Sequence, residues 1–479
     1  MRSILMVTAE FSPLAKTGGL GEVCGTLPLQ LKKEGVDVRV IMPRYASIPI
    51  EYTANMRFVK EIYVYLGWRK QYCGIFELNW QGVQIYLVDN LYYFGGDSIY
   101  SDESFDIERF AFFGMAVLSA LPHVDFAPEV IHCHDWHTSF VPILHQAHFK
   151  RIQFYSKMKM IMTIHNLKYQ GFCEKERLND LLGINDEYSV AGAVQINGNM
   201  TNCLKGALSL VDKITTVSET YAKEIQNSYF GEGLDWLLRW RVNDLTGILN
   251  GIDYDLYNPE ADPMIPLTYS VNNFAAHKKK NKMKIQEVLK LDVNSGVPVI
   301  ALVSRFVGQK GIELIMHVLD DMLSNIDMQF IVLGTGEGRY EQYFRDMAAR
   351  YPDKMSANIF YEDVLAHRIY AGADFILMPS LFEPCGISQL IALRYGTLPI
   401  VRETGGLNDT VISFNEETGE GNGYTFAHFN AHDMLYTVQR ALAIYQNRET
   451  HNSIVKSAMR CDFSWEASAK QYIQLYENL

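Results

Sequence analysis

The chain has 479 residues, of which 48% are hydrophobic and 20% charged, an ordinary composition for a folded globular protein. Its formal net charge of -12 argues against a general nucleic-acid binder, because such proteins carry a basic face. Residues 110–121 form the longest uncharged apolar run, well short of the about 20 residues that a membrane-spanning helix needs, and residues 1–9 are too short for a signal-peptide core. We therefore expect a cytoplasmic protein that binds neither nucleic acid nor membranes.

The cysteine pattern and the chain length indicate which stabilising sites and how many domains to expect. The seven cysteines are scattered without a CxxC pair, so the sequence indicates neither a disulfide framework nor a zinc site. Single hydrophobic cores stop growing near about 250–300 residues, which favours two large domains.

In the first half of the chain, short apolar runs alternate with helical patterns. The amphipathic stretch at residues 20–33 predicts a helix, and residues 58–88, which alternate and are rich in aromatics, predict an antiparallel meander inserted into an α/β domain. Compact apolar runs predict buried parallel strands at residues 4–9, 36–42, 130–133, 160–164, 214–217 and 246–249.

The same alternation restarts in the second half. A basic run of Lys278, Lys279 and Lys280, continued by Lys282 and Lys284, is expected to be the solvated start of a helix. Strands are predicted at residues 299–303, 329–333, 375–378 and 398–401, and helices at 312–324, 339–350, 387–395 and 431–446. Two runs of β-α alternation predict two doubly wound α/β domains, and turn residues place the boundary near residues 250–266.

A glycine-rich loop follows the first predicted strand. It reads KTGGL at residues 16–20 and leads directly into a predicted helix. Glycines let a backbone approach a ligand closely, amides at a helix N-terminus attract anions, and Lys16 adds a positive charge suited to phosphate. The loop is neither a dinucleotide fingerprint nor a P-loop, and alone such a glycine pair is more often a simple tight turn.

The equivalent loop of the second half carries two cations. Arg305 and Lys310 stand on either side of Gly308, just past the predicted strand at 299–303. Open α/β sheets bind ligands beyond the carboxyl ends of their strands. A planar guanidinium and a compact ammonium suit a diphosphate whose charge grows as it leaves, although the spacing alone also fits exposed surface cations.

Two further loops of the second half precede helices. The sequence EPCG at residues 383–386 follows one predicted strand, and Thr404, Gly405 and Gly406 follow the next. Glu383 could contact a sugar hydroxyl, stabilise positive charge at an anomeric carbon, or serve as the partner of a helix N-terminus. The amides of residues 404–406 again suit phosphate.

Histidines gather after two strands of the first half. His132, His134, Asp135 and His137 surround Trp136 at residues 132–137, and a His-Asn pair follows at 165–166. Adjacent residues are poorly spaced for metal ligation compared with helix-spaced motifs such as HExxH. We expect polar side chains that contact sugar in a cleft, and no metal.

Taken together, these motifs resemble the bacterial glycogen synthases and plant starch synthases, the retaining ADP-glucose-type glycosyltransferases of family 5. The resemblance rests on the loop at 16–20 and, in order along the whole chain, on HCHDWHT, TIHN, NGID, SRFVGQKG, the stretch from HRIYAGADF to GGLNDTV, and GNGYTF. One such motif would be weak evidence, whereas the ordered set is highly specific.

The resemblance implies a GT-B fold, in which two Rossmann-like domains face each other across a cleft. It assigns residues 1–249 to the N-terminal acceptor-side domain and 250–457 to the C-terminal donor-side domain. Residues 458–479 are expected to form a helix that crosses back onto the first domain.

The resemblance also implies roles for individual residues. Arg305 and Lys310 hold the donor diphosphate, and Tyr361 stacks on the base. The residues that close on the phosphates are Lys16, Gly18, Gly19, Thr404, Gly405 and Gly406. The residues that surround the transferred glucose are Asp135, His165, Asn166, Asn250, Glu383, Cys385 and Tyr93. The catalytic set is Glu383, Asp135, His165, Arg305 and Lys310.

The implied reaction is transfer of glucose from ADP-glucose to the non-reducing end of an α-1,4-glucan, with retention, without a cofactor and without a metal. No second carboxylate suited to a retaining double displacement is evident, so a front-face mechanism with Glu383 beside the oxocarbenium-like centre is favoured over Asp135 as nucleophile. The oligomeric state is not indicated by the sequence.

Other assignments stay open. A UDP-glucose user or a different GT-B transferase, such as a sucrose- or trehalose-forming one, shares the architecture. A pyridoxal-phosphate glucan phosphorylase would need a lysine motif that is not found. A non-catalytic glucan-binding homologue could keep the fold, but the six polar residues Lys16, Asp135, His165, Arg305, Lys310 and Glu383 are all present.

Overall fold

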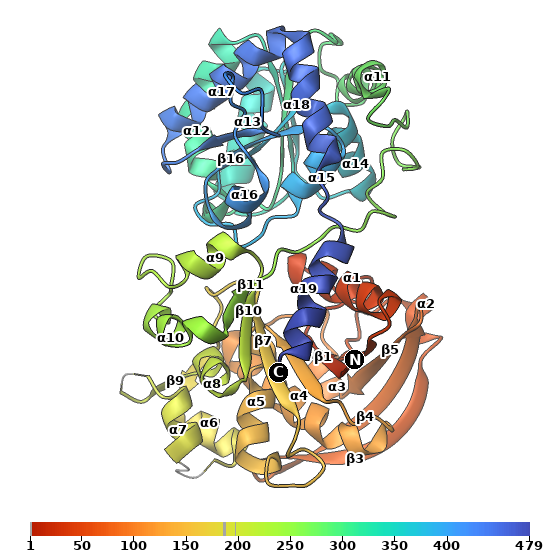
Figure 1. Ribbon diagram of the computed structural model, residues 1–479, viewed down its shortest axis with the longest axis vertical. Helices are drawn as coiled ribbons and strands as arrows, with labels where there is room; N and C mark the ends of the chain where they lie inside the picture. The colour runs from red at the N-terminus through yellow and green to blue at the C-terminus, as the bar shows by residue number, and fades with distance from the viewer. Residues whose placement is uncertain (1, 185–187, 197) are drawn as a thin grey trace. The chain divides into compact units, whose positions relative to one another are not determined.

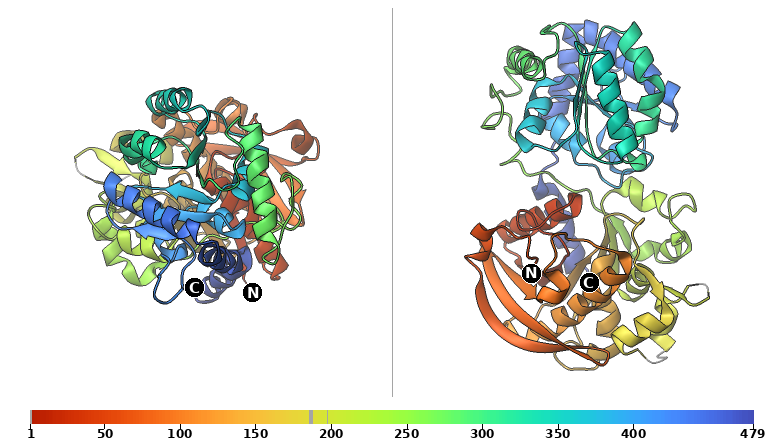
Figure 2. Two further views of the ribbon diagram at one scale, coloured as in Figure 1. Left: turned by 90° about the horizontal axis from the view of Figure 1, so that it is seen from above. Right: turned by 180° about the vertical axis from the view of Figure 1, so that it is seen from behind.

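The computed structural model describes residues 2–184, 188–196 and 198–479 of the chain. The chain divides into two compact units: unit 1 comprises Met1–Leu249 together with Trp465–Leu479, and unit 2 is Asn250–Ser464. Each unit has a largely parallel sheet with helices on both faces (Figure 1, Figure 2). The two-domain, doubly wound α/β fold expected from the sequence is therefore confirmed.

Unit 1 is built on a nine-stranded sheet with the order β11-β10-β7-β6-β1-β2-β5-β4-β3. Its pairs are parallel except β5–β4 and β4–β3, and a separate antiparallel ribbon pairs β8 with β9. The strands are β1 (Ser3–Val7), β2 (Asp37–Pro43), β3 (Arg57–Leu66), β4 (Arg69–Trp80), β5 (Val83–Asp89), β6 (Val130–His134), β7 (Lys159–Ile164), β8 (Phe172–Glu174), β9 (Met200–Asn202), β10 (Lys213–Thr216) and β11 (Leu245–Gly247).

The helices of unit 1 include the amphipathic helix expected after the glycine-rich loop. They are α1 (Gly19–Lys33), α2 (Ile50–Thr53), α3 (Leu91–Phe94), α4 (Glu103–Ala120), α5 (Phe140–Leu144), α6 (Lys175–Leu182), α7 (Tyr188–Val194), α8 (Cys203–Leu210), α9 (Glu219–Glu224), α10 (Asp235–Trp240) and α19 (Trp465–Glu477). The longest, α4, is capped at its N-terminus by Asp102, whose side chain accepts a hydrogen bond from the amide of Phe105 at 3.0 Å.

The expected antiparallel meander forms as β3, β4 and β5. It is not a separate insertion, because β5 also pairs in parallel with β2 and so joins the meander to the main sheet. Figure 2 shows these strands as the curved edge of the unit 1 sheet.

Unit 2 is built on a six-stranded parallel sheet with the order β14-β13-β12-β15-β16-β17. Its strands are β12 (Val299–Val303), β13 (Gln329–Leu333), β14 (Met355–Asn358), β15 (Phe375–Met378), β16 (Leu398–Arg402) and β17 (Tyr424–Phe426). Its helices are α11 (Phe274–Val288), α12 (Ile312–Asn325), α13 (Gly338–Arg350), α14 (Asp363–Gly372), α15 (Ser388–Arg394), α16 (Gly405–Thr410), α17 (Ala431–Gln446) and α18 (Arg448–Arg460).

The central strands of both sheets match the predicted runs because they are covered on both faces. Every residue of β12 and of β6 is buried, so each reads as a compact run in the sequence. The two outer strands of unit 2, β14 and β17, were not predicted. They are only four and three residues long and include the polar residues Ser356, Asn358 and Thr425, so they lack a distinctive pattern.

The C-terminal return to unit 1 begins at Trp465, not at Ala458 as expected. Helix α18 still belongs to unit 2, and the chain turns at residues 461–464 before α19 begins. The turn is held to unit 2 because the amide of Phe463 donates to Tyr254 Oη at 2.9 Å and its carbonyl accepts from the Ile252 amide at 2.9 Å. Within unit 1, α19 lies beside α1 (Figure 1).

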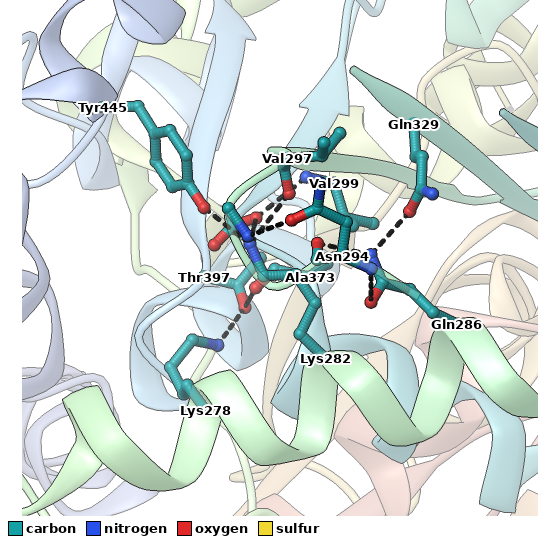
Figure 3. A network of polar contacts seen from close by, with 12 residues as sticks. Lys278, Lys282, Gln286, Asn294, Val297, Val299, Gln329, Ala373, Thr397 and Tyr445 are labelled. Carbon is teal, nitrogen blue, oxygen red and sulfur yellow. Dashed lines mark hydrogen bonds and ion pairs between the residues drawn. The ribbon is translucent and has the colours of Figure 1, made fainter. Parts of the chain in front are cut away.

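The basic run on α11 is not fully solvated, contrary to expectation. Lys278 is buried, and its ammonium donates to the carbonyls of Tyr370, Ala371 and Tyr395 at 3.1–3.2 Å. It also donates to Thr397 Oγ1 at 2.8 Å (Figure 3). These carbonyls lie at the carboxyl ends of α14 and α15, where orphan acceptors and the helix dipoles favour a cation.

Lys282, one turn further along α11, is buried with a carboxylate. Its ammonium donates to Asp374 Oδ2 at 2.7 Å and to the carbonyl of Val297 at 3.0 Å, and the same Asp374 oxygen accepts from the amide of Val299 at 2.8 Å (Figure 3). Lys278 and Lys282 are four residues apart and therefore lie on the same, buried face of the helix. Lys279 and Lys280 between them are exposed.

Replacing Lys282 with Met should destabilise unit 2 by roughly 3–5 kcal/mol, because the change leaves the Asp374 carboxylate buried without its cation. Lys280→Met, on the exposed face of the same helix, should stay within about 0.5 kcal/mol of the parent. Urea unfolding followed by circular dichroism would measure both variants. Equal stability of the two would show that the buried pair is dispensable.

Candidate active site

The predicted donor-side residues of unit 2 all lie at one edge of its sheet. Arg305 and Lys310 follow β12, Glu383 follows β15, the loop at residues 404–406 follows β16, and Tyr361 follows β14. Since β14, β12, β15 and β16 belong to one parallel sheet, their carboxyl ends share an edge. The structure therefore brings together residues that are up to about a hundred positions apart in the sequence.

Lys310 and Glu383 are the closest pair at this edge. The Lys310 ammonium donates to Glu383 Oε2 at 2.6 Å, and the hydroxyl of Ser380 donates to the same oxygen at 2.9 Å. Both charged side chains are largely shielded from solvent. The predicted phosphate cation and the predicted sugar-side carboxylate are thus in direct contact.

The glycines at 405 and 406 pack against the loop that carries Glu383. A Cβ atom on Gly405, which has φ +46°, would stand 1.9 Å from the carbonyl oxygen of Glu383. The Gly406 amide donates to the carbonyls of Glu383 and Pro384 at 3.1 and 3.2 Å. We expected this amide to face phosphate, and here it instead fixes the position of the Glu383 loop.

Cys385 and Asn250 lie together in unit 2. Burial raises the pKa of the Cys385 thiol to about 12, and hydrogen bonds with Asn250 oppose that shift. Within the described residues, the buried Oδ1 of Asn250 has no hydrogen-bond partner. Buried polar atoms are rarely left unsatisfied, so this oxygen is a candidate acceptor for a ligand hydroxyl.

Arg305 and Tyr361 are the exposed members of the set. The Tyr361 side chain is 60% exposed, and its hydroxyl donates to Asp363 Oδ1 at 2.7 Å. A tyrosine held at its hydroxyl with much of its surface exposed is suited to stacking on a flat ligand ring.

In unit 1, the predicted residues other than Tyr93 lie at the carboxyl ends of the neighbouring strands β7, β6 and β1. Asp135 follows β6 directly and has φ +59° and ψ 174°, a backbone region that is populated almost only by glycine. Its amide donates to the Thr163 carbonyl at 2.9 Å, and its own carbonyl accepts from the amide and the hydroxyl of Thr138 at 3.1 and 2.9 Å. Strain of this kind persists only where surrounding contacts fix it, and it is concentrated at functional sites.

The carboxylate of Asp135 accepts hydrogen bonds from the residues that follow β7. Its Oδ1 accepts from the amides of His165 and Asn166 at 2.7 and 3.4 Å. Burial raises the pKa of Asp135 to about 7, although these two amides oppose the shift and Glu10 adds to it slightly. The structure therefore brings Asp135, His165 and Asn166 into one cluster, as predicted.

Two of the histidines expected to contact sugar are core residues. His132 bonds Tyr476 Oη at 2.8 Å and Thr163 Oγ1 at 2.6 Å through its two ring nitrogens, and His134 Nδ1 lies 3.0 Å from His165 Nε2. Both His132 and His134 are fully buried, so neither can contact a sugar in this structure. Burial lowers the pKa of His165 to about 3, so its ring is neutral near pH 7.

Tyr93 is also a core residue, which argues against its predicted contact with sugar. Its ring stacks on Phe112 with centroids 4.7 Å apart, its hydroxyl donates to Glu108 at 3.1 Å, and only 1% of it is exposed. Tyr92, one residue earlier, is exposed instead. Helix α3 has a single turn, and sequence alone did not fix which of the two tyrosines faces inward.

The glycine-rich loop after β1 is anchored by Glu10, a residue that was not predicted as part of the site. Its Oε2 accepts from the amides of Thr17 and Gly18 at 2.6 and 3.3 Å, and its Oε1 accepts from the Thr17 hydroxyl at 2.8 Å. The Gly18 amide, expected to face phosphate, is therefore used by Glu10. An acidic residue directly after a buried apolar strand was the available signal in the sequence.

Lys16 projects from this loop and is exposed, with Glu22 3.8 Å away as a weak ionic partner. Among the described residues, no group of three or more His, Cys, Asp or Glu side chains is arranged to hold a metal ion. The groups that the structure places at the two edges are cations, carboxyl groups, backbone amides and a neutral imidazole.

Asp135→Asn should raise stability more at about pH 8 than at about pH 4. Between its ordinary pKa near 3.9 and about 7, Asp135 is ionised in the unfolded chain but protonated in the folded one, so the parent loses stability as pH rises through this window. Asparagine cannot ionise, keeps the oxygen that accepts the two amides, and has nearly the shape of aspartate, so the strained backbone costs both residues about the same.

Calorimetric melting temperatures at the two pH values would measure this gain. The exposed Asp97→Asn serves as the control and should show no such dependence. A gain for Asp135→Asn that is equal at both pH values would contradict the raised pKa.

Comparisons with known families agree with this geometry. Residues 3–240 match the family described as "Starch synthase catalytic domain", and residues 284–459 match "Glycosyl transferases group 1". These two matches correspond to the bulk of unit 1 and of unit 2.

Curated relatives and solved structures match over the whole chain. A "Glycogen synthase" of Geobacillus thermodenitrificans is 51% identical and covers 99% of this chain and 97% of its own, and one of Lachnospira eligens is 49% identical with full coverage of both. The catalytic domain of starch synthase IV from Arabidopsis thaliana, bound to ADP and acarbose, has a TM-score of 0.91 and 30% identity, covering 100% of this chain and 99% of that one. In the described residues, every helix is too short or too polar to cross a membrane.

Proposed function

Because the chain belongs to the glycogen and starch synthase family of glycosyltransferases, we propose that it transfers glucose from ADP-glucose to the non-reducing end of an α-1,4-glucan with retention of configuration. The observation that carries this proposal is the Lys310–Glu383 pair at the carboxyl edge of the unit 2 sheet, with Arg305 on the same loop as Lys310. A cation pair beside a carboxylate is what a reaction with a leaving diphosphate and a positive anomeric centre requires.

In this proposal, unit 2 binds the donor. Arg305 and Lys310 neutralise the diphosphate as it leaves, and by analogy with oxyanion holes each well-placed donor is worth roughly 2.7–4 kcal/mol of transition-state stabilisation. Tyr361 stacks on the nucleobase. Fixed cations of this kind replace the divalent ion used by many other sugar-nucleotide enzymes, so we propose a metal-independent reaction.

Glu383 stabilises the oxocarbenium-like centre. In the unliganded chain its charge is balanced by Lys310 at 2.6 Å. When the diphosphate draws the Lys310 ammonium, the carboxylate is left with less compensating charge, and its attraction for a positive anomeric carbon increases. Asn250, with its unpartnered Oδ1, and Cys385 are proposed to contact the transferred glucose.

Unit 1 contributes Lys16, Asp135, His165 and Asn166. Asp135 is a poor candidate for a nucleophile, because with its pKa near 7 it is partly protonated at neutral pH and two backbone amides engage its oxygen. This favours a front-face mechanism, in which the departing phosphate accepts the proton of the acceptor hydroxyl. Asp135 then acts as a hydrogen-bond partner of the sugar, beside the neutral imidazole of His165.

ADP-glucose is proposed as the donor because the solved relative at 30% identity is bound to ADP and acarbose. Acarbose is an oligosaccharide analogue, which also supports an α-glucan acceptor. We place the protein in the cytoplasm, where it acts on soluble nucleotide sugar and glucan.

Incorporation of glucose into a glycogen primer should be highest from ADP-glucose, lower from UDP-glucose and absent from glucose 1-phosphate, and it should survive EDTA. Lys310→Ala and Glu383→Ala should each lower kcat about 10²–10³-fold, while Lys279→Ala on the exposed face of α11 should leave it unchanged. Radiolabel incorporation measures all four proteins.

A preference for UDP-glucose would support the proposed glucosyl transfer but contradict the proposal that ADP-glucose is the donor. Activity lost with EDTA and restored by a divalent ion would overturn metal independence. Glycogen binding without transfer from any donor would identify a glucan-binding protein instead of an enzyme.

Tyr361→Ala should raise the KM for ADP-glucose about 10-fold and leave the KM for the primer unchanged, because it removes one stacked ring, worth roughly 1–3 kcal/mol per base in other proteins. Tyr361→Phe, which keeps the ring and loses only the bond to Asp363, should remain close to the parent. If the two variants lose affinity equally, the hydroxyl and not the ring is what the donor requires.

A further inference from the structure

The loop that carries Lys16 has little protein above it. Residues 16–19 are all exposed, and a Cβ atom on Gly18 would have no heavy atom within 4 Å. Such a loop would sample many shapes unless something fixed it from below. Its shape matters for the proposed function, on which this inference rests, because Lys16 is assigned to the donor phosphates.

Glu10 supplies that fixed point. Its side chain is 3% exposed, so a buried carboxylate just past the carboxyl end of β1 contacts the exposed loop. It accepts hydrogen bonds from two consecutive loop amides, those of Thr17 and Gly18, and from the Thr17 hydroxyl. Holding both amides sets the direction of the chain on either side of them, and Lys16 is the residue directly before.

The fit around Glu10 leaves no room for a side chain at Gly21, in the first turn of α1. A Cβ atom on Gly21 would lie 2.6 Å from Lys16 Cβ and 3.1 Å from Glu10 Oε2. Lys16, Glu10 and the first turn of α1 therefore pack closely against one another. This packing places Lys16 beside the N-terminus of α1.

Glu10 is also tied to the Asp135 cluster. The hydroxyl of Tyr100 donates to Glu10 Oε1, and the ring of Tyr100 stacks on His137 with centroids 4.7 Å apart. His137 lies two residues beyond Asp135, in the turn that follows β6. One buried carboxylate thus connects the phosphate loop with the turn that carries Asp135.

Four donors converge on this group: two amides and two hydroxyls. An ionised carboxylate accepts all four, and a glutamine in the same place can still satisfy the amides through its oxygen while its NH₂ faces the hydroxyls. Alanine can do neither.

We infer that Glu10 is a positioning residue for the proposed reaction: it holds the loop at 16–18 in the shape in which Lys16 meets the diphosphate of the donor. It touches no substrate itself. Its loss should therefore weaken the binding of diphosphate-containing ligands far more than the binding of glucan.

The test combines hydrogen–deuterium exchange with ADP binding on the full-length protein. In Glu10→Ala, the amides of Thr17 and Gly18 should exchange at least 10-fold faster, the Kd for ADP by titration calorimetry and the KM for ADP-glucose should rise at least 10-fold, and the KM for the glucan primer should stay unchanged. Glu10→Gln should restore slow exchange and near-parental ADP affinity. Glu34→Ala, at the other end of α1, is the matched control and should change none of these.

Where Glu10→Ala does not fold, Glu10→Asp provides the same contrast with Glu10→Gln, because a shorter side chain withdraws the carboxylate from both amides. Unchanged exchange at residues 17–18 would overturn the anchoring, and faster exchange with unchanged ADP affinity and KM would overturn its role in donor binding. If the parent protein binds no ADP and uses no ADP-glucose, the proposed function fails and this assignment fails with it. If the parent protein is active and Glu10→Ala changes neither the Kd for ADP nor the KM for ADP-glucose, the role assigned to Glu10 fails while the proposed function stands.

Discussion

Parallel strands of one sheet end at the same edge, and the candidate site in each unit depends on this constraint. In unit 2 it gathers the loops after β14, β12, β15 and β16, and in unit 1 those after β1, β6 and β7. Backbone amides, cations and carboxyl groups that are far apart in the sequence thereby become neighbours. Nothing in the helices or in the hydrophobic core would place them together without this common edge.

Several polar groups at each edge are held by other polar groups of the protein. Lys310 and Glu383 neutralise each other, Glu10 occupies two loop amides, and Asp135 accepts from the amides after β7. This preorganisation matters for catalysis, because donors and charges that are already fixed need no rearrangement when charge develops. The strained backbone at Asp135 is one cost of that arrangement.

Buried charges away from the site serve the fold that carries it. On α11, Lys278 donates to carbonyls at the carboxyl ends of α14 and α15. Lys282 donates to Asp374, which lies beside β15 and also accepts from the first amide of β12. The N-terminal ends of α14 and α15 and the carboxyl ends of β12 and β15 adjoin the loops of Tyr361, Arg305 and Glu383. Two buried lysines, which the sequence suggested were solvated, thus stabilise the helices and strands whose other ends carry the site loops.

The sequence by itself determined the two-domain α/β fold, the family and most of the residues at the strand ends. It could do so because buried parallel strands are compact apolar runs, and because the glycine-rich and charged motifs are contiguous. Burial, in contrast, is decided by neighbours that are distant in the chain. Tyr476 and Thr163 make His132 a core residue, Phe112 and Glu108 do the same for Tyr93, and the ends of two helices enclose Lys278.

The same reason explains why Glu10 and the role of the 405–406 glycines became visible only in the folded chain. A glycine pair at a helix start reads the same whether its amides face a phosphate or the carbonyls of a loop more than twenty residues away, as those of Glu383 and Pro384 do for Gly406. Likewise, a glutamate after a strand reads the same whether it faces solvent or accepts from two amides of a neighbouring loop. Local pattern sets the element, but only tertiary packing chooses the partner of each polar group, because that partner comes from another part of the chain.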